Sequence, residues 1–169
     1  MSLSLHSVLV TNPVHMLRNI LAWLDKAHAH ADAKSTDSAN YLSLRLAPDM
    51  LAFDKQVLIV SEVAKLGASR MTGVEAPKSE HEDANLQDLR QRLQQTIDYL
   101  ETISPAQIDE SPIREIVIPQ RGKEALVFDQ NGFVQRWMQP NFFFHATTIY
   151  ALLRNAGVDL GKADYLGIH

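Results

Sequence analysis

The feature that most constrains the fold of this sequence is a run of apolar residues at regular helical spacing near its middle. Intervals of 3, 4, 4 and 3 residues separate Leu86, Leu89, Leu93, Ile97 and Leu100. This spacing places them on one side of an α-helix, and the Gln, Arg and Asp residues between them occupy the other sides. Asn85 suits the N-cap position, and the Ser104-Pro105 pair ends the run.

Three further segments have helical signals, with apolar residues at helical spacing and breakers at their ends. They run from near Leu3 to about Asp32, from Pro48 or Asp49 to about Thr72, and from about Gln139 to Ala156. Pro13 either begins the main part of the first helix, with Asn12 as its cap, or kinks a longer helix. Gly157 suits a left-handed cap at the end of the last helix.

The apolar period changes from helical spacing to alternation between the third and the last helix. Ile116 and Ile118 alternate with other residues, as do Leu126 and Phe128, on either side of a polar turn over residues 120–123. This pattern predicts a β-hairpin. The predicted fold class is therefore all-α: one domain over residues 1–169, built as a four-helix bundle with a small hairpin inserted between helices three and four.

The charge balance argues against nucleic acid as a partner. The chain has 16 Lys and Arg against 20 Asp and Glu, a formal net charge of -4, whereas a phosphate backbone calls for a clustered basic face. The longest uncharged run, residues 137–153, contains Pro140 and His145 and is too short to span a membrane. The stretch before Arg18 has no basic segment of the signal-peptide type. These features predict a cytoplasmic protein with no membrane partner.

Polar residues fall on helix faces that a bundle should bury. In the second predicted helix, Asp49 and Gln56 share a stripe with apolar residues. In the last one, Asn141, His145 and Thr148 are spaced by 4 and 3. Bundles build ligand sites from such inward side chains on facing helices. We therefore expect Asp49, Gln56, Asn141, His145 and Thr148 to form a small polar pocket between helices two and four. The alternative is that these groups only satisfy one another.

Three blocks of the sequence are similar to a known family. They are residues 44–50 (LRLAPDM), residues 140–158, which begin PNFFFH, and residues 160–167 (LGKADYLG). Together they resemble a bacterial family of unknown function within the DinB/YfiT-like metalloenzyme superfamily. The resemblance implies a four-helix bundle that is usually dimeric. Metal-binding members of the superfamily hold a divalent ion with one histidine from helix two and an H-x-x-x-H pair from helix four. Some members are thiol-dependent transferases or isomerases.

Carried over residue by residue, the resemblance places His145 at the second histidine of the helix-four pair. The first histidine then falls at Asn141, and the helix-two ligand falls near Gln56. An imidazole with two neutral amides is a poor ligand set for a transition metal. Asp49 is the nearby carboxylate that could substitute for a missing ligand, and His145 is the candidate metal ligand. We expect no cofactor and no catalytic metal.

Three functions are compatible with these residues. The first is a metal-free bundle that binds a small uncharged polar molecule at His145, Asn141 and Gln56. The alternative is an enzyme with a divalent metal on His145, acting on thiols as a transferase or isomerase. The third is a structural or regulatory homodimer, in which the apolar residues of the hairpin pack across a two-fold axis. In the block that begins at Gly161, we expect Lys162 and Asp164 to hold the segment against the bundle, with Tyr165 and Leu166 buried.

Overall fold

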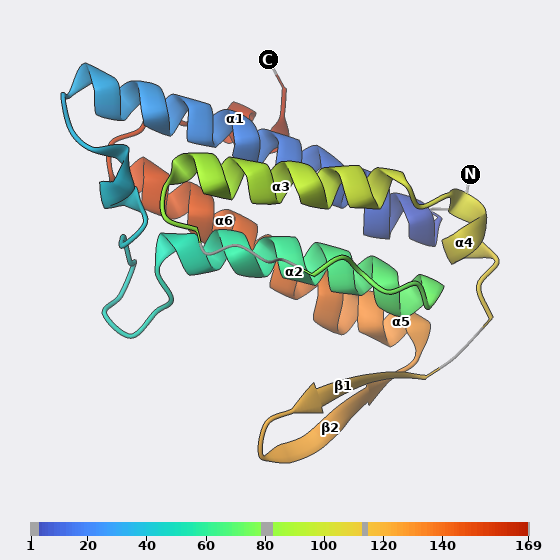
Figure 1. Ribbon diagram of the computed structural model, residues 1–169. Coiled ribbons are helices and arrows are strands. Elements are labelled where there is room, and N and C mark those ends of the chain that lie inside the picture. The colour runs from blue at the N-terminus through green and yellow to red at the C-terminus, as the bar shows by residue number, and fades with distance from the viewer. Residues whose placement is uncertain (1–3, 79–82, 113–114, 169) are drawn as a thin grey trace.

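Four long helices lie side by side in the computed structural model, which describes residues 4–78, 83–112 and 115–168 (Figure 1). They are α1 (Asn12–Ala33), α2 (Phe53–Thr72), α3 (Leu86–Glu101) and α6 (Gln139–Asn155). Helix α1 contacts α3 and α6, and α2 contacts the same two helices, so the four close around one core. The predicted fold class, helices with one small hairpin between the third and the last long helix, is confirmed.

The core is apolar where the four long helices face one another. Trp23, Phe53, Phe133 and Phe142 are among its largest fully buried side chains. The stripe that defined α3 is buried as predicted, and the Asn85 side chain caps that helix by accepting a hydrogen bond from the Asp88 backbone N–H at 3.0 Å. Within the described residues, no helix is both long enough and apolar enough to cross a bilayer.

Two of the long helices are preceded by a π-helical turn, and a proline is the second residue after each turn. Residues Ser7–Thr11 form the turn η1 ahead of Pro13 in α1, and Val134–Met138 form η3 ahead of Pro140 in α6. A proline inside a helix lacks the N–H that would bond to residue i−4, and its ring clashes with that carbonyl. A wider turn moves the carbonyl away and keeps the helix continuous. Of the two alternatives for Pro13, the structure therefore has the longer helix.

The fourth helical segment begins earlier than predicted. The short helix α5 (Gln130–Phe133) leads without a break into η3 and then α6, so helical structure starts nine residues before Gln139. The side chain of Asp129 caps it by accepting a hydrogen bond from the Gly132 N–H at 2.5 Å.

The start of the second helix is also corrected. Helix α2 begins at Phe53, because residues 47–50 form a turn and Ala52 is extended, with φ −71° and ψ 165°. The 3₁₀ turn η2 (Ser38–Tyr41) lies on the same connection between α1 and α2. Asp49 consequently lies outside the helix, in an exposed turn.

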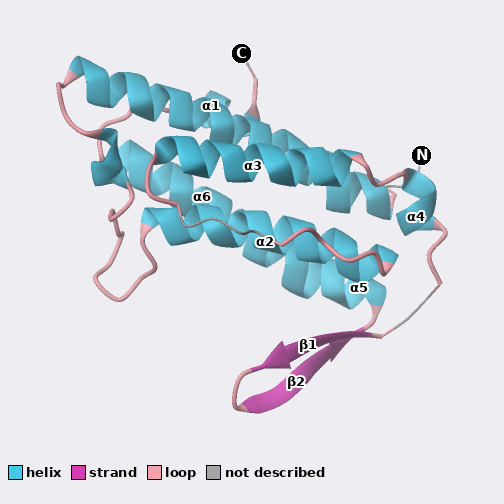
Figure 2. Ribbon diagram, viewed as in Figure 1, coloured by secondary structure: helices cyan, strands magenta, loops and turns pink. Residues whose placement is uncertain are grey.

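The hairpin consists of β1 (Ile116–Gln120) and β2 (Lys123–Phe128), and it extends away from the helices (Figure 2). The strands are antiparallel, with Ile118 opposite Leu126 and Val117 opposite Val127. Ile116 and Ile118 are buried, whereas Val117 and Val127 are more than half exposed. The short helix α4 (Pro105–Asp109) precedes the hairpin in the chain. The predicted hairpin is confirmed. The alternation separates a buried face from an exposed one only in β1, because β2 is exposed as far as Val127 and Leu126 is 37% exposed.

The block that begins at Gly161 forms the short helix α7 (Lys162–Leu166), which packs on α1. Asp164 pairs with Lys26 at 2.6 Å, and the Trp23 indole N–H donates to the Asp164 carbonyl oxygen at 3.1 Å. The ring of Tyr165 stacks on that of Trp23. Asp164 and Tyr165 thus hold the segment in place. Lys162 is exposed and makes no hydrogen bond or ion pair with the described residues, so the prediction that it holds the segment is wrong. Tyr165 is half-buried and Leu166 is exposed, so the prediction that Leu166 is buried is also wrong.

Candidate functional site

The clearest polar pair inside the bundle joins α6 to the first turn of α2. His145, in the middle of α6, is 8% exposed, and Gln56 is 1% exposed. The two side chains meet through a hydrogen bond of 2.6 Å between His145 Nδ1 and Gln56 Oε1. They lie 89 positions apart in the sequence, and the inward stripes of the two helices predicted that they would face each other.

The hydrogen bonds of Gln56 determine which ring nitrogen of His145 holds the proton. The Gln56 side-chain nitrogen Nε2 donates to the Leu51 carbonyl oxygen at 3.0 Å, so its oxygen is the atom that faces the imidazole. An amide oxygen only accepts, so Nδ1 must donate. The tautomer that follows from this network has hydrogen on Nδ1 and a lone pair on Nε2.

Burial favours the neutral imidazole, since it lowers the pKa of His145 from its ordinary value. Nε2 makes no hydrogen bond with any residue that the structure describes. It is also absent from the fully enclosed polar atoms that lack a partner, so it keeps some contact with solvent. The exposed ring of Phe144 stands edge-on to the imidazole, at 5.2 Å between ring centroids. His145 therefore offers a neutral acceptor beside an aromatic surface.

The other members of the predicted pocket make hydrogen bonds within their own helix. The Thr148 hydroxyl donates to the Phe144 carbonyl oxygen at 2.8 Å. The Asn141 side-chain nitrogen donates to the Trp137 carbonyl oxygen at 2.6 Å. Of the five predicted residues, the structure joins only Gln56 and His145 directly.

The prediction that Asp49 faces the interior of the bundle is wrong. It lies in the exposed turn over residues 47–50, because α2 begins at Phe53, four or five residues later than expected. Asp49 therefore cannot replace a missing ligand from the first turn of α2.

The donor set at these positions does not fit the three-histidine metal site implied by the resemblance. Both polar ends of the Gln56 amide are engaged, on His145 and on Leu51, and the Asn141 nitrogen is held by its own helix. Only one imidazole nitrogen is left as a strong donor for a metal. Across the described ranges there is no group of three or more His, Cys, Asp or Glu side chains that could hold an ion.

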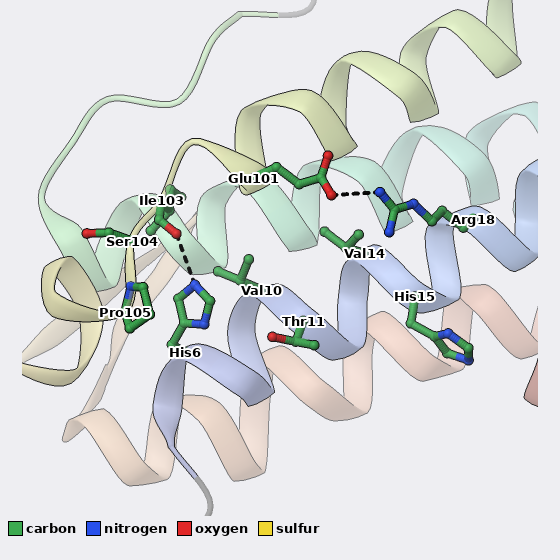
Figure 3. Close-up of a pocket in the computed structure, with 10 residues that line it drawn as sticks. All are labelled: His6, Val10, Thr11, Val14, His15, Arg18, Glu101, Ile103, Ser104 and Pro105. Atoms are coloured by element: carbon green, nitrogen blue, oxygen red, sulfur yellow. Dashed lines mark hydrogen bonds and ion pairs between the residues drawn. The ribbon is translucent and has the colours of Figure 1, made fainter.

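A larger cavity, which sequence reasoning did not predict, lies between the start of the first helix and the end of α3 (Figure 3). Its volume is about 600 Å³. Its ionic groups bond within the chain: Arg18 pairs with Glu101 at 2.6 Å, and the His6 Nε2 lies 2.9 Å from the Ile103 carbonyl oxygen. His15 turns toward the Leu166 carbonyl oxygen, at 3.0 Å from Nε2. The residues that meet here are 83 to 151 positions apart, so spacing along the chain could not have revealed the cavity.

Comparison with known proteins gives a family without an assigned function. A family model described as a domain of unknown function (DUF1993) matches residues 5–166. A crystal structure of a DinB family member protein from Shewanella denitrificans is 36% identical in sequence, with a TM-score of 0.87. The match covers 98% of this chain and 93% of that one. No curated protein matches the sequence.

Proposed function

This chain belongs to the DUF1993 family of DinB-like proteins, and from that premise we propose that it binds a small, uncharged polar molecule at His145 without a metal. The observation that carries the proposal is the Nε2 lone pair of His145, which is held in one tautomer by Gln56 and left without a partner in the described part of the chain. The ligand would donate an N–H or O–H to Nε2. An apolar portion of the ligand would lie on the ring of Phe144.

The test is a ligand-observed NMR screen with small neutral amides, alcohols and azoles. We expect compounds that bind the wild-type protein to lose binding to His145→Phe, which fills the space of the ring but has no Nε2. The matched control is Thr148→Val, because Thr148 is also buried on α6 and its hydroxyl bonds only to its own helix. Equal binding to His145→Phe and wild type would overturn the proposal. If His145→Phe does not fold, His145→Gln takes its place in the same comparison.

The metal-dependent alternative makes a separate prediction about composition. An enzyme of the thiol transferase or isomerase type would contain about one divalent ion per chain, bound through His145. Plasma mass spectrometry on tag-free protein purified without chelators would measure this ratio. Because the donor set favours the metal-free proposal, we expect a ratio far below one. A full equivalent of zinc, nickel or iron that is lost in His145→Phe would instead support the alternative.

The homodimer is a further proposal, and it concerns the outer face of the hairpin. Val117 and Val127 pair across the strands and are 51% and 55% exposed. The two-stranded sheet has no third strand among the described residues, so the outer edges of β1 and β2 are unpaired there. Apolar side chains beside free strand edges favour association. A second copy of the chain that packs on this face would cover both features.

A further inference from the structure

A second cavity lies between α2, the hairpin and the α5–η3 segment. Its volume is about 240 Å³, slightly below the range of about 300–1,000 Å³ that is typical of drug-sized ligands. Most of its lining is apolar: Val63 and neighbouring residues come from α2, Ile118 from the inner face of β1, and Trp137 from η3. The size and lining suit a small molecule with a compact apolar body.

Two charged residues also line this cavity, and they differ in their partners. Glu62 pairs with Lys65 at 2.7 Å, so its charge is balanced within α2. Arg70 has no hydrogen bond, ion pair or ring contact with any residue that the structure describes. Its side chain is half-buried, and burial lowers the pKa of the guanidinium. Arg70 lies in the last turn of α2, where the negative end of the helix dipole favours a cation. This interaction does not use the N–H donors of the guanidinium.

We propose that this cavity binds a small monocarboxylate, with its carboxylate on the Arg70 guanidinium and its apolar body against Val63, Ile118 and Trp137. The guanidinium presents a planar pair of N–H donors that matches the two oxygens of a carboxylate. In an apolar setting such a charge-assisted pair is stronger than the same pair in water. The ligand would therefore provide a counter-ion for Arg70, the one charged residue in the cavity that lacks a partner within the described residues.

This site is separate from the one proposed at His145, and neither proposal depends on the other. None of the residues that line this cavity is His145 or Gln56. Loss of carboxylate binding would therefore leave the His145 proposal unaffected, and the reverse also holds.

The experiment uses hexanoate as the probe and hexanamide as its neutral counterpart of similar size. The chain has two tryptophans, so a ¹H–¹⁵N NMR spectrum of the whole protein contains two indole N–H signals. Trp137 lines the cavity, whereas Trp23 is buried elsewhere and bonds to the Asp164 carbonyl oxygen. We expect hexanoate to move the Trp137 signal in a saturating way and to leave the Trp23 signal in place. Hexanamide should need a concentration about tenfold higher or more, since it lacks the charge-assisted bond.

Two substitutions test the role of Arg70. Arg70→Met keeps much of the side-chain length and removes the charge, and we expect it to weaken hexanoate binding about tenfold or more without changing hexanamide binding. The matched control is Arg154→Met, because Arg154 is also an arginine in the last turn of a helix but does not line this cavity. If Arg70→Met does not fold, the comparison of hexanoate with hexanamide in the wild-type protein decides the question alone.

Three results would overturn the proposal. Hexanoate and hexanamide could bind equally, or Arg70→Met could bind hexanoate as wild type does. The Trp137 signal could also fail to respond to hexanoate. In that last case, a Trp137 signal that moves with protein concentration alone would mean that a second copy covers the cavity.

Discussion

At the scale of single residues, the central feature is a buried histidine whose tautomer is set by a glutamine. The Gln56 side-chain oxygen accepts a hydrogen bond from His145 Nδ1–H, and the Gln56 side-chain nitrogen donates one to the Leu51 carbonyl oxygen. Because both side chains are buried, the free energy of this arrangement depends on each keeping its partner. Two predictions about stability follow from this pair.

The first prediction concerns pH. Burial lowers the pKa of His145 in the folded protein. Just below pH 6.5, His145 is therefore protonated to a greater extent in the unfolded chain than in the folded one. The contribution of His145 to stability is therefore complete above about pH 6.5 and is lost as the pH falls toward the lower, folded pKa. Urea unfolding at several pH values, compared between wild type and His145→Gln, measures this contribution. The wild-type protein should lose more stability on acidification than the variant, and parallel curves would show that His145 does not titrate as expected.

The second prediction concerns the acceptor. Gln56→Met keeps the volume of the side chain but removes the hydrogen-bond partner of the His145 Nδ1–H and of the Leu51 carbonyl oxygen. We expect the free energy of unfolding to fall by about 1–3 kcal/mol. Gln56→Glu is the informative companion, because a carboxylate at this position should raise the pKa of His145, as followed by NMR of the ring. A Gln56→Met variant as stable as wild type would contradict the proposed network.

At the scale of elements, the starts of α3 and α5 are each fixed by a hydrogen bond from a backbone N–H to a side chain three residues earlier. The Asn85 cap on α3 is the simplest to test, since its side chain satisfies the backbone N–H of Asp88. Asn85→Ala should lower the free energy of unfolding by about 1 kcal/mol, whereas Asn85→Ser should retain most of it. Chemical denaturation of both variants against wild type would check this. An equal loss of unfolding free energy in Asn85→Ala and Asn85→Ser would mean that the hydrogen bond of the cap contributes little.

Elements defined by strong local patterns could be predicted from the sequence. The stripe of α3 with its Asn85 cap and the alternation around Ile118 both gave the observed structure. The early start of the fourth helix was missed, because the prediction began that helix at Gln139 and the structure begins it at Gln130. In the structure Pro140 lies within a continuous helix, where the η3 turn accommodates it. The period of the apolar residues carries no marker for such a widened turn.

The candidate site could be predicted only in part, for a related reason. Gln56 and His145 both lie within the observed helices, so the spacing of their apolar neighbours was enough to predict their inward direction. The predicted position of Asp49 depended on where α2 begins. Helix boundaries are set by the geometry of the adjoining loop, which helix propensity does not determine. The Arg70 cavity is closed by the hairpin, and how a hairpin docks on a bundle is a tertiary property.

At the scale of the whole molecule, the hairpin leaves an apolar outer face that the rest of the chain does not bury. If a second copy covers it, replacing both Val117 and Val127 with Lys should convert a dimer to a monomer by placing cations in the interface. Light scattering at several protein concentrations measures this. Ile118 is unsuitable for the test, because it is buried against its own chain. A dimer that persists in the double variant would exclude the hairpin from the interface.

The docking of α7 on α1 has a consequence for how the chain folds during synthesis. The Trp23 indole N–H donates to the carbonyl oxygen of Asp164, which lies 141 positions later in the sequence, and the indole stacks on the ring of Tyr165. Such distant contacts form late and slow folding, and a nascent chain is synthesised at only about 5–20 residues per second. On the ribosome, several seconds therefore pass between the synthesis of Trp23 and that of Asp164 and Tyr165, and the indole lacks these two contacts during that time. During that interval the first helix exposes an apolar aromatic side chain, and transiently exposed surface of this kind makes an incompletely folded chain prone to aggregation.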